Sequence, residues 1–547
     1  MSRTAAIYFE PEGYSISRPN IMGRNAAGYG FLRALFRYSQ ASEHTAICAT
    51  KDHAVVFDSM ARENGSTKPT RSMARDDTKS LTEIGCMFVP GPGLGQMAFE
   101  RSFVRPDAWS ICGVTHTILS DRVMNTLTAA VTEPVEEWDA IICTSHVVRE
   151  AIETVFEAEE ERLRRRLGAK RFIRPQFPII PLGVHADDFT SLAPRRDLVR
   201  ERLGIAKDEV VILFVGRLSF HAKAHPYAMY QALNEISAHH KICLIESGYF
   251  YNDFIRDSFN ELHSAIAPRV KRIIIDGRSK DASFDAWSAA DIFCSLSDNY
   301  QETFGLTPIE AMAAGLPVVV SDWNGYRDTV RDGVDGYRIP TTAPPPSFNP
   351  DFVKHYAYGR DNYDIYTGKT SLTVGIDIAN ATRALKSLIE NPDLRRKMGD
   401  AGRQRTHSVY DWRHVIRQYE DLWAELSARR AHHQAAETVK NPWPARMSPY
   451  RVFQAYASKF IDPSLKLIRR QALTQPDPNI VMSLRSFALA PSLTGGTMTL
   501  GKVIERFAFD EPRSISDLSS PNDITSDQFL ANIAIAIKCG YLIIAEE

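Results

Sequence analysis

The sequence of 547 residues lacks several features that mark specialised classes of protein. Its seven cysteines are scattered and form no CxxC pair, which argues against a disulfide framework or a zinc site and favours a reducing compartment. No run of about 18 apolar residues occurs, so no helix is expected to span a bilayer. Residues 1–15 lack the apolar stretch of a signal peptide. We therefore expect a soluble, cytoplasmic protein.

An excess of charge of either sign is also absent. The chain has 65 Lys and Arg against 66 Asp and Glu, a net charge of −1. This balance gives no general attraction to nucleic acid or to an anionic membrane, so any such contact has to come from a local patch. At roughly 100–200 residues per domain, the length allows three to four domains.

Short apolar segments alternate with helical patterns through most of the chain. A first group occupies residues 5–9, 45–49, 110–115, 140–145 and 177–182, and a second group occupies residues 209–216, 241–247, 271–277, 291–297 and 317–322. Strands that are apolar on both faces are typical of parallel sheets covered by helices. The pattern predicts an α/β fold with two Rossmann-like, doubly wound domains that meet near residues 190–200.

The pattern changes after residue 340. Residues 341–350 are rich in proline and residues 359–371 look irregular, so a long loop is expected, which in a compact protein is often functional. Residues 431–490 have a mixed pattern and are predicted to be a linker with some helix. Residues 491–547 show two helical patterns and a strand, which predicts a small mixed helical, winged-helix-like module. Its eight acidic and four basic residues argue against binding to nucleic acid and favour partner docking or oligomerisation.

Residues 295–340, SLSDNYQETFGLTPIEAMAAGLPVVVSDWNGYRDTVRDGVDGYRIP, are the most informative segment. A strand is predicted to end near Ser297. A helix is predicted to begin at Thr307 as its N-cap, with Pro308 at the favoured first position, and to stop at Gly315.

The residues just ahead of this helix suit an anionic ligand. The amides of Phe304, Gly305 and Leu306 would lie at the helix N-terminus, where unpaired N–H groups and the helix dipole favour a phosphate. Gly305 would let the ligand approach the backbone closely.

Two carboxylates flank this loop. Glu310 is the fourth residue of Thr-Pro-Ile-Glu, a capping box in which its side chain would reach back to the Thr307 amide. The helix rules alone leave this structural role and a ligand role equally open. Glu302 has no comparable structural role, and its ordinary alternative is a solvated loop carboxylate.

A second candidate site lies in residues 214–226, FVGRLSFHAKAHP. Arg217 follows a buried strand, and Lys223 comes six residues later. Ligands of open α/β sheets bind at the carboxyl ends of the strands, and two cations there suit a diphosphate. Two solvated surface charges are the alternative, and the glycine-containing helix start in the same predicted domain argues against it.

Together these motifs resemble the retaining glycosyltransferases of family four, which have the two-domain GT-B fold. The resemblance rests on E-TFGLTPIEAMAAGLPVVVSD with its Glu-x7-Glu spacing and on VGR followed by Lys223. Residues 138–152 and 178–189 match two further landmarks. The resemblance implies domains at 1–195 and 196–405 that face a cleft, joined by crossover helices at 406–430, where Trp412 and Trp423 are expected to be packing anchors.

The resemblance implies roles for the charged residues. Arg217 and Lys223 would bind the diphosphate of the donor and stabilise the charge that grows as it leaves. Glu310 would hold the ribose hydroxyls of the nucleotide, which shifts the balance away from the capping box. Glu302 would contact the donor sugar.

Further positions follow from the same resemblance. The amides of residues 304–306 would touch sugar and phosphate, and Gly277 and Arg278 would lie along the base. His116 matches a family histidine near the donor sugar, with an ordinary histidine at a strand end as the alternative. Gly28 and Gly30, in the segment MGRNAAGYGFLRAL at 22–35, match a glycine loop ahead of a helix that lies across the cleft near the donor phosphates and the acceptor.

The implied function is a retaining hexosyl transfer from a nucleotide-diphosphate sugar to a sugar, lipid-linked or protein acceptor, in the synthesis of a bacterial-type polysaccharide or glycoconjugate. The family favours a front-face route in which the leaving phosphate helps to take the proton of the acceptor. No DxD motif is evident, and neither a metal nor another cofactor is expected. The alternatives are a catalytically silent sugar-nucleotide-binding protein that recruits a partner through its C-terminal module, and a GT-B-type epimerase or phosphorylase.

A basic cluster in the first domain leaves one more alternative open. A helix is predicted over residues 151–174, with Glu160–Arg164 and Glu161–Arg165 spaced as helix pairs. Its cations are Arg162, Arg164, Arg165, Arg166, Lys170, Arg171 and Arg174. A solvated helix is the ordinary interpretation, and a peripheral contact of residues 162–174 with anionic lipid at the inner membrane face is the functional one.

Overall fold

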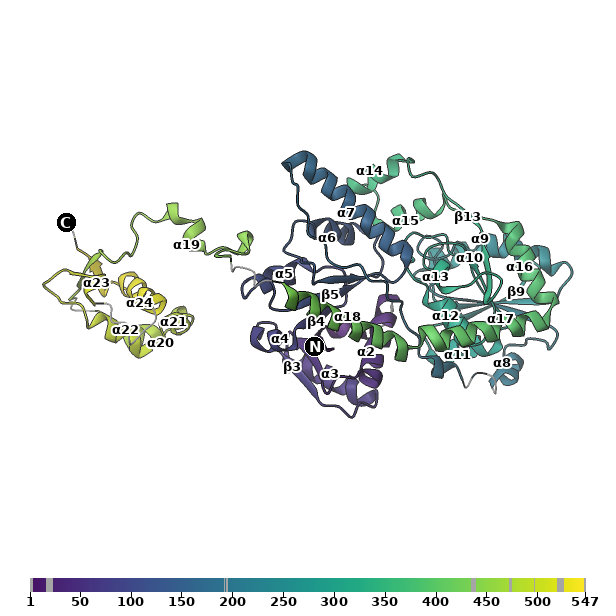
Figure 1. Cartoon of the computed structure of the whole chain (residues 1–547), viewed down its shortest axis with the longest axis horizontal. Coiled ribbons are helices and arrows are strands. Elements are labelled where there is room, and N and C mark those ends of the chain that lie inside the picture. Colours follow the sequence, from purple (N-terminus) through teal and green to yellow (C-terminus); the bar gives the residue numbers. More distant parts are fainter. Residues whose placement is uncertain are drawn as a thin grey trace. The chain divides into compact units, whose positions relative to one another are not determined.

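The computed structural model describes residues 3–15, 23–190, 192, 195–433, 439–471, 475–495, 497–518 and 526–545. The chain forms two compact units, Met1–Pro444 and Ala445–Glu547 (Figure 1). The first unit holds two α/β domains, and the second holds a small sheet with helices.

The first domain is built on a parallel sheet of six strands in the order β3-β2-β1-β4-β5-β6. In chain order the strands are β1 (Ala6–Phe9), β2 (His44–Cys48), β3 (Thr70–Met73), β4 (Cys86–Val89), β5 (Ser110–Val114) and β6 (Ala140–Ile142). The order reverses between β1 and β4, which is the doubly wound Rossmann arrangement.

The second domain repeats this topology. Its six parallel strands have the order β12-β11-β10-β7-β8-β9. In chain order they are β7 (Val210–Val215), β8 (Ile242–Gly248), β9 (Lys271–Asp276), β10 (Ile292–Ser295), β11 (Val318–Ser321) and β12 (Gly336–Ile339). The predicted fold class, two doubly wound domains followed by a small mixed region, is confirmed.

The strands of the two sheets differ from the predicted ones in two ways: one predicted strand does not form, and three observed strands were not predicted. Residues 177–182 form no strand and make only isolated bridges, such as Cys143 with Ile179. Pro178 and Pro181 have no N–H to donate, so a continuous ladder cannot form there. The strands β3, β4 and β12 were not predicted. The strand β3 is polar and half exposed at a sheet edge, and β12 is an edge strand that begins with a glycine.

Helices cover both faces of the two sheets (Figure 1). Those of the first domain are α1 (Pro11–Tyr14), α2 (Gly23–Tyr38), α3 (Lys51–Glu63), α4 (Thr78–Ile84), α5 (Gly95–Ser102), α6 (Asp121–Ala129) and α7 (His146–Leu167). Those of the second domain are α8 (Arg196–Arg202), α9 (Tyr227–Ser237), α10 (Asp253–Ile266), α11 (Lys280–Ala289), α12 (Leu306–Ala313), α13 (Tyr326–Thr329), α16 (Ile378–Glu390) and α17 (Pro392–Arg405). Each sheet is buried between two apolar clusters.

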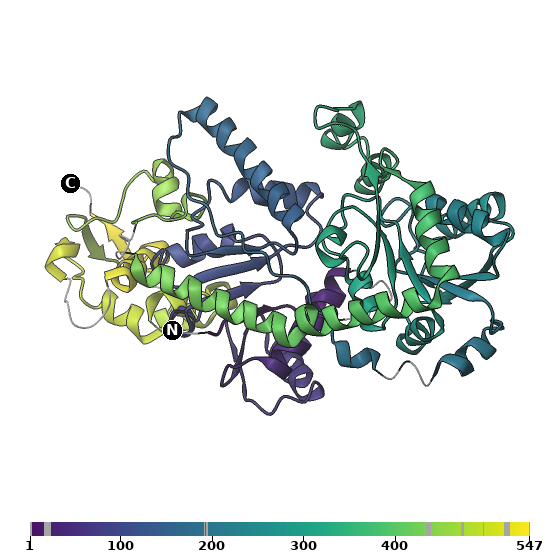
Figure 2. The same cartoon turned by 45° about the vertical axis from the view of Figure 1, so that its right-hand side comes forward.

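The chain returns to the first domain through α18 (Trp412–His432), which follows α17 and a short π-helical segment, Thr406–Tyr410. Figure 2 shows α17 and α18 running along one side of both domains. Trp412 and Trp423 are buried in the core of the first domain, next to Phe31 and Phe88, which confirms them as packing anchors.

The segment expected to be an irregular loop after residue 340 is a loop only in part: residues 343–350 are irregular as predicted, but about half of the segment is helical. It contains α14 (Asp351–Ala357) and α15 (Tyr363–Ser371), and its base is closed by the antiparallel pair β13 (Thr341–Thr342) and β14 (Gly375–Ile376). The pattern was hidden because neither helix has a clear apolar stripe, and α15 holds a glycine and three threonine or serine residues.

The second unit has its own core. Its antiparallel sheet has the order β16-β15-β17, formed by β15 (Lys466–Arg469), β16 (Arg513–Ser514) and β17 (Leu542–Ile544). Its helices are α19 (Pro449–Val452), α20 (Pro478–Ser483), α21 (Ala490–Thr494), α22 (Thr497–Ile504), α23 (Ile515–Leu518) and α24 (Ser526–Lys538). Leu467 and Met482 are buried in this core, so the segment predicted as a linker supplies a central strand and a helix.

Within the described ranges, no helix is both long enough and apolar enough to cross a membrane.

Candidate functional site

A cavity of about 730 Å³ lies between the two α/β domains. The loops after β4 and β5 and the start of α2 line it from the first domain. The loops after β7, β8 and β10 and the start of α12 line it from the second domain. The carboxyl ends of both parallel sheets therefore face the cavity, which is where open α/β sheets bind ligands.

The two walls contact each other directly. The buried Ser145 hydroxyl donates to the Thr303 carbonyl at 2.8 Å, and the His146 amide donates to the Asp328 carboxylate at 2.7 Å. The Thr117 hydroxyl donates to the Gln301 carbonyl at 3.3 Å. These hydrogen bonds join the two walls of the cleft.

Lys223 and Glu302 form an ion pair in the wall of the second domain. The Lys223 Nζ atom lies 2.9 Å from Glu302 Oε2, and the two side chains are 35% and 18% exposed. Burial by itself would raise the pKa of Glu302, but the Lys223 ammonium and the amides of Thr303 and Phe304 outweigh it and lower the pKa. The structure thus brings the predicted cation and the predicted carboxylate together.

Glu310 also lines the cavity, and it differs from Glu302 in having no cation beside it. Within the part of the chain that the structure describes, its carboxylate has no hydrogen-bond or ion-pair partner, and burial raises its pKa to about 7. A carboxylate kept half-protonated near neutral pH is typical of a position that a ligand completes.

The predicted N-cap, Thr307, is wrong, and the capping box that stood as the alternative for Glu310 does not form. The helix α12 begins at Leu306, and its N-cap is Gly305, which has a left-handed φ of 87°. A Cβ at Gly305 would lie 2.1 Å from the Tyr326 ring, so glycine is required there for the close approach of Tyr326. Because Thr307 is already inside the helix, Glu310 has no capping role, and the first amides of α12 lie at the cavity as predicted.

Arg217 and His116 face the cavity from opposite domains. Among the described residues, no carboxylate or carbonyl pairs with Arg217. Burial, together with the nearby Arg24 guanidinium, lowers the pKa of His116 to about 4, so the imidazole is neutral at neutral pH.

Gly28 and Gly30 do not form the predicted loop. Both lie inside α2 and outside the lining of the cavity, where Gly23 and Arg24 stand instead. A Cβ at Gly28 would lie 2.4 Å from the Gly13 carbonyl oxygen, and one at Gly30 would lie 3.1 Å from the Trp412 indole nitrogen. Their small size serves packing of α2 against α1 and α18.

Gly277 and Arg278 also lie outside the cavity lining. Arg278 is paired with Asp276 at 2.6 Å, and its guanidinium lies 5.7 Å from the centre of the Tyr249 ring. Tyr249 itself lines the cavity. Sequence reasoning missed Tyr249, although its place directly after a buried strand was a usable signal.

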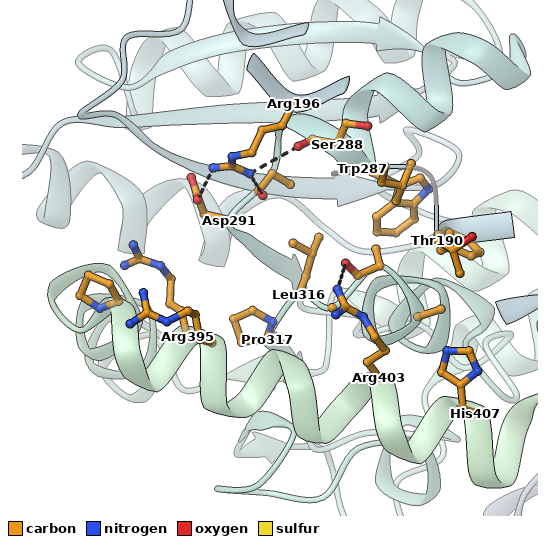
Figure 3. A pocket seen from close by; sticks show the side chains of 18 residues that line it. Thr190, Arg196, Trp287, Ser288, Asp291, Leu316, Pro317, Arg395, Arg403 and His407 are labelled. Carbon is orange, nitrogen blue, oxygen red and sulfur yellow. Dashed lines mark hydrogen bonds and ion pairs between the residues drawn. The ribbon is translucent and has the colours of Figure 1, made fainter. Parts of the chain in front are cut away.

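A second cavity, of about 650 Å³, lies at the amino ends of the strands of the second sheet (Figure 3). Its lining includes four arginines, but each already has a partner. Arg196 bonds the Ala290 carbonyl and Asp291, and Arg395 bonds the last carbonyls of α16. Arg403 bonds the Ala314 carbonyl.

Three helices therefore end at this second cavity, and arginines cap their C-termini. The carboxyl end of a helix carries partial negative charge, which attracts cations and disfavours an anion. The fourth arginine, Arg396, is paired with Asp393. This cavity is stabilised by its arginines and has no free cation for a ligand among the described residues.

The basic helix of the first domain is shorter than predicted. The helix α7 ends at Leu167, because Gly168 adopts a left-handed φ of 69°. The predicted Glu160–Arg164 and Glu161–Arg165 pairs are confirmed, at 3.0 and 3.4 Å.

Other cations of this cluster are paired as well. Arg162 pairs with Glu159 at 2.5 Å, and Arg174 pairs with the buried Glu160 at 2.5 Å. In the described part of this segment, the cations that lack a partner are Arg166, Lys170 and Arg171.

One group of possible metal ligands, Asp187, His407 and Asp411, occurs among the described residues. Arg413 pairs with both carboxylates, which already balances their charge. The group does not line the cleft cavity.

Comparison with known proteins gives a family match that lies mainly in the second domain. The family model of the glycosyl transferases group 1 matches residues 195–345. The D-inositol 3-phosphate glycosyltransferase of Xylanimonas cellulosilytica is 30% identical over 165 residues, covering 29% of this chain and 38% of that protein. The phosphatidyl-myo-inositol mannosyltransferase of Mycobacterium tuberculosis is 30% identical over 166 residues, covering 30% and 40%.

These matches span about two fifths of the length of those two relatives.

Among solved structures, the Anabaena protein HepE in complex with UDP has a TM-score of 0.49 at 15% identity, covering 77% of this chain and all of that chain. The sucrose-phosphate synthase of Thermosynechococcus elongatus has a TM-score of 0.46 at 16% identity, covering 78% and 99%.

Proposed function

We propose that this protein is a retaining glycosyltransferase that moves a sugar from a nucleotide-diphosphate sugar to an acceptor, because residues 195–345 match the family model of the glycosyl transferases group 1. The observation that carries the proposal is the arrangement at the cleft. Arg217 and the first amides of α12 lie on the same wall as the Lys223–Glu302 pair, at the carboxyl ends of the strands.

This wall is suited to a diphosphate leaving group. Arg217 can form two parallel hydrogen bonds to phosphate oxygens, and it has no protein partner to give up among the described residues. The Lys223 ammonium has three donors, so it can keep Glu302 and bind a phosphate oxygen as well. The N-terminus of α12 adds amides and the positive end of its dipole. These groups would stabilise the charge that develops as the diphosphate departs.

The carboxylates and the histidine are proposed to bind the rest of the donor. Glu302, held ionised by Lys223, would accept from hydroxyls of the sugar. Glu310 would accept from the ribose hydroxyls, which supply the polar partners that it lacks within the described part of the chain. The neutral His116 would exchange hydrogen bonds with the sugar from the opposite wall. Catalysis would rest on positioning and charge stabilisation, with the leaving phosphate taking the proton of the acceptor.

The acceptor is proposed only as a class, a sugar, lipid-linked or protein acceptor in polysaccharide or glycoconjugate synthesis. The exposed Arg24 and Arg122 line the wall of the first domain, and neither has a partner among the described residues. This supports including phosphorylated polyols among the acceptors, in line with the names of the inositol-directed relatives. Any contact of residues 162–174 with anionic lipid would rest on Arg166, Lys170 and Arg171.

A screen of nucleotide sugars tests the proposal. We expect one donor to release its nucleotide, slowly in water and faster with an acceptor, and this release to continue in a chelator. Arg217→Ala or Lys223→Ala is expected to abolish it. Tight binding of a donor with no turnover for any acceptor would favour the alternative, a catalytically silent binding protein. Loss of release in the chelator, restored by a divalent ion, would contradict the metal-free route.

A further inference from the structure

Residues 343–374 leave the second domain as a closed excursion. They depart after β12, at the edge of the sheet, and return at α16. The pairs Thr341–Ile376 and Thr342–Gly375 close their base, and the Asp377 amide donates to the Pro340 carbonyl at 3.0 Å. The sheet is complete without this excursion, so the contacts of the excursion indicate its role. We call it the insertion.

The insertion has a defined internal structure. The rings of Tyr356 in α14 and Tyr366 in α15 stack with centres 4.3 Å apart and planes at 7°. Phe352 packs against the edge of Tyr366. Lys369 and Asp361 form an ion pair of 2.6 Å that ties α15 to the turn before it. The two helices are thus joined as one packed body.

The helix α15 contacts the loops that carry Lys223 and Glu302. The hydroxyl of Tyr363, which lines the cavity, donates to Gln301 Oε1 at 3.1 Å. Gln301 Nε2 donates to the Ala222 carbonyl at 3.0 Å. Gln301 directly precedes Glu302, and Ala222 directly precedes Lys223. One side chain, held by Tyr363, therefore links the two loops of the ion pair.

A second contact supports the same loop. A Cβ at Gly368 would lie 3.2 Å from the Cβ of His221, so the backbone of α15 packs closely on residue 221. The Asp364 carboxylate lies 3.8 Å from the His221 ring. The insertion thus holds the loop of Lys223 from two positions on α15.

The helix α14 reaches across to the first domain (Figure 1). The Asp121 amide donates to the Tyr356 hydroxyl at 3.1 Å, and this hydroxyl donates to Asp121 Oδ1 at 3.1 Å. Asp121 is the first residue of α6, and its neighbours Ser120 and Arg122 line the cavity. The insertion therefore touches both walls of the cleft.

From this geometry we propose that the insertion is a positioning element for the transfer reaction. Tyr363 sets the geometry of the Lys223–Glu302 pair through Gln301, and Tyr356 couples that geometry to the position of α6. The inference rests on the proposed function, because the pair it positions is the one assigned to the donor. Tyr363 and Tyr356 act through other groups and are positioning residues.

The kinetic test uses the full chain with Tyr363→Phe and, as a matched control, Tyr358→Phe. Tyr358 is 85% exposed on the same insertion. Loss of one neutral hydrogen bond is expected to lower kcat by about 5–10-fold. The KM of the donor should stay within about 2-fold, because the groups that bind the donor remain. Tyr358→Phe should change neither value.

A double-mutant cycle identifies the route of the effect. Gln301→Leu is expected to lower kcat at least as much as Tyr363→Phe, and the double variant should lose no more than Gln301→Leu alone. Equal kcat in Tyr363→Phe and Tyr358→Phe, or additive losses in the double variant, would overturn the role of Tyr363.

An exchange measurement tests Tyr356 without any substrate. Tyr356→Phe removes the acceptor of the Asp121 amide, so hydrogen exchange at the start of α6 should be at least about 3-fold faster than in the wild type and in Tyr358→Phe. Unchanged exchange would refute the contact across the cleft. A wild-type chain that turns over no donor would refute the proposed function instead, and the exchange result would stand apart from it.

Discussion

The second domain contributes cations to two cavities, and the two differ in the partners of those cations. At the edge with the amino ends of the strands, the arginines cap the carboxyl ends of helices or pair with aspartates (Figure 3). In the cleft, Arg217 has no partner among the described residues, and Lys223 pairs with a carboxylate that itself lines the cavity. Cationic side chains thus indicate a ligand site only where some of their hydrogen-bond donors remain available to a ligand.

The largest expected effect on activity comes from replacing a single arginine of the cleft. Arg217→Ala should lower kcat/KM by about 10²–10³-fold, since it removes a donor that stabilises developing charge. Arg403→Ala, in the other cavity, should leave kcat/KM within about 2-fold and lower the free energy of unfolding by about 0.5–1 kcal/mol, because Arg403 is half exposed. Turnover assays and urea unfolding measure the two quantities. Equal losses of activity would contradict the distinction between the cavities.

Glu310→Gln sharpens the contrast between the two carboxylates of the cleft. Burial raises the pKa of Glu310 to about 7, so the folded state holds this proton more tightly than the unfolded state does. Its contribution to stability is therefore full below the ordinary carboxyl range and is lost as the pH rises to about 7. Glu310→Gln should match the wild type at about pH 4 and be about 2–3 kcal/mol more stable at about pH 8.

The matched control is Glu302→Gln, because Lys223 lowers the pKa of Glu302. Removing this partner should destabilise the protein at pH 8. Nucleotide binding provides a second readout, since Glu310→Gln should remove any rise in affinity between pH 6 and pH 8. A stability difference for Glu310→Gln that does not change with pH would argue against a buried, unpaired carboxylate.

The smallest expected effect is on stability, and it distinguishes a glycine needed for packing from one that binds a ligand. Gly28→Ala should lower the free energy of unfolding by about 1–2 kcal/mol, because its new methyl group would meet the Gly13 carbonyl oxygen. Gly13→Ala is the control, since a Cβ at Gly13 meets nothing within 4 Å. Neither variant should change the KM of the donor. A raised KM in Gly28→Ala with normal stability would restore the role first predicted for this glycine.

Much of the fold follows from local patterns. The apolar runs predicted two doubly wound domains because strands buried on both faces have an unbroken apolar sequence. The missed strands β3 and β12 are sheet edges, where one side faces solvent and the pattern weakens. The helices of the insertion lack an apolar stripe, because their aromatic side chains pack on each other and on the cleft.

The sequence by itself placed Arg217, Lys223 and Glu302 in loops that follow buried strands. This is local information, since strand ends and helix starts depend on residues close in the chain. The ligand role of Glu310 and the shared cleft were implied only by the resemblance to a known family. Only the tertiary structure decided which groups satisfy each other. Among the described residues, it paired Lys223 with Glu302 and left Glu310 without a partner. It also brought Tyr363 to Gln301, because hydrogen bonds between distant segments depend on how the domains pack.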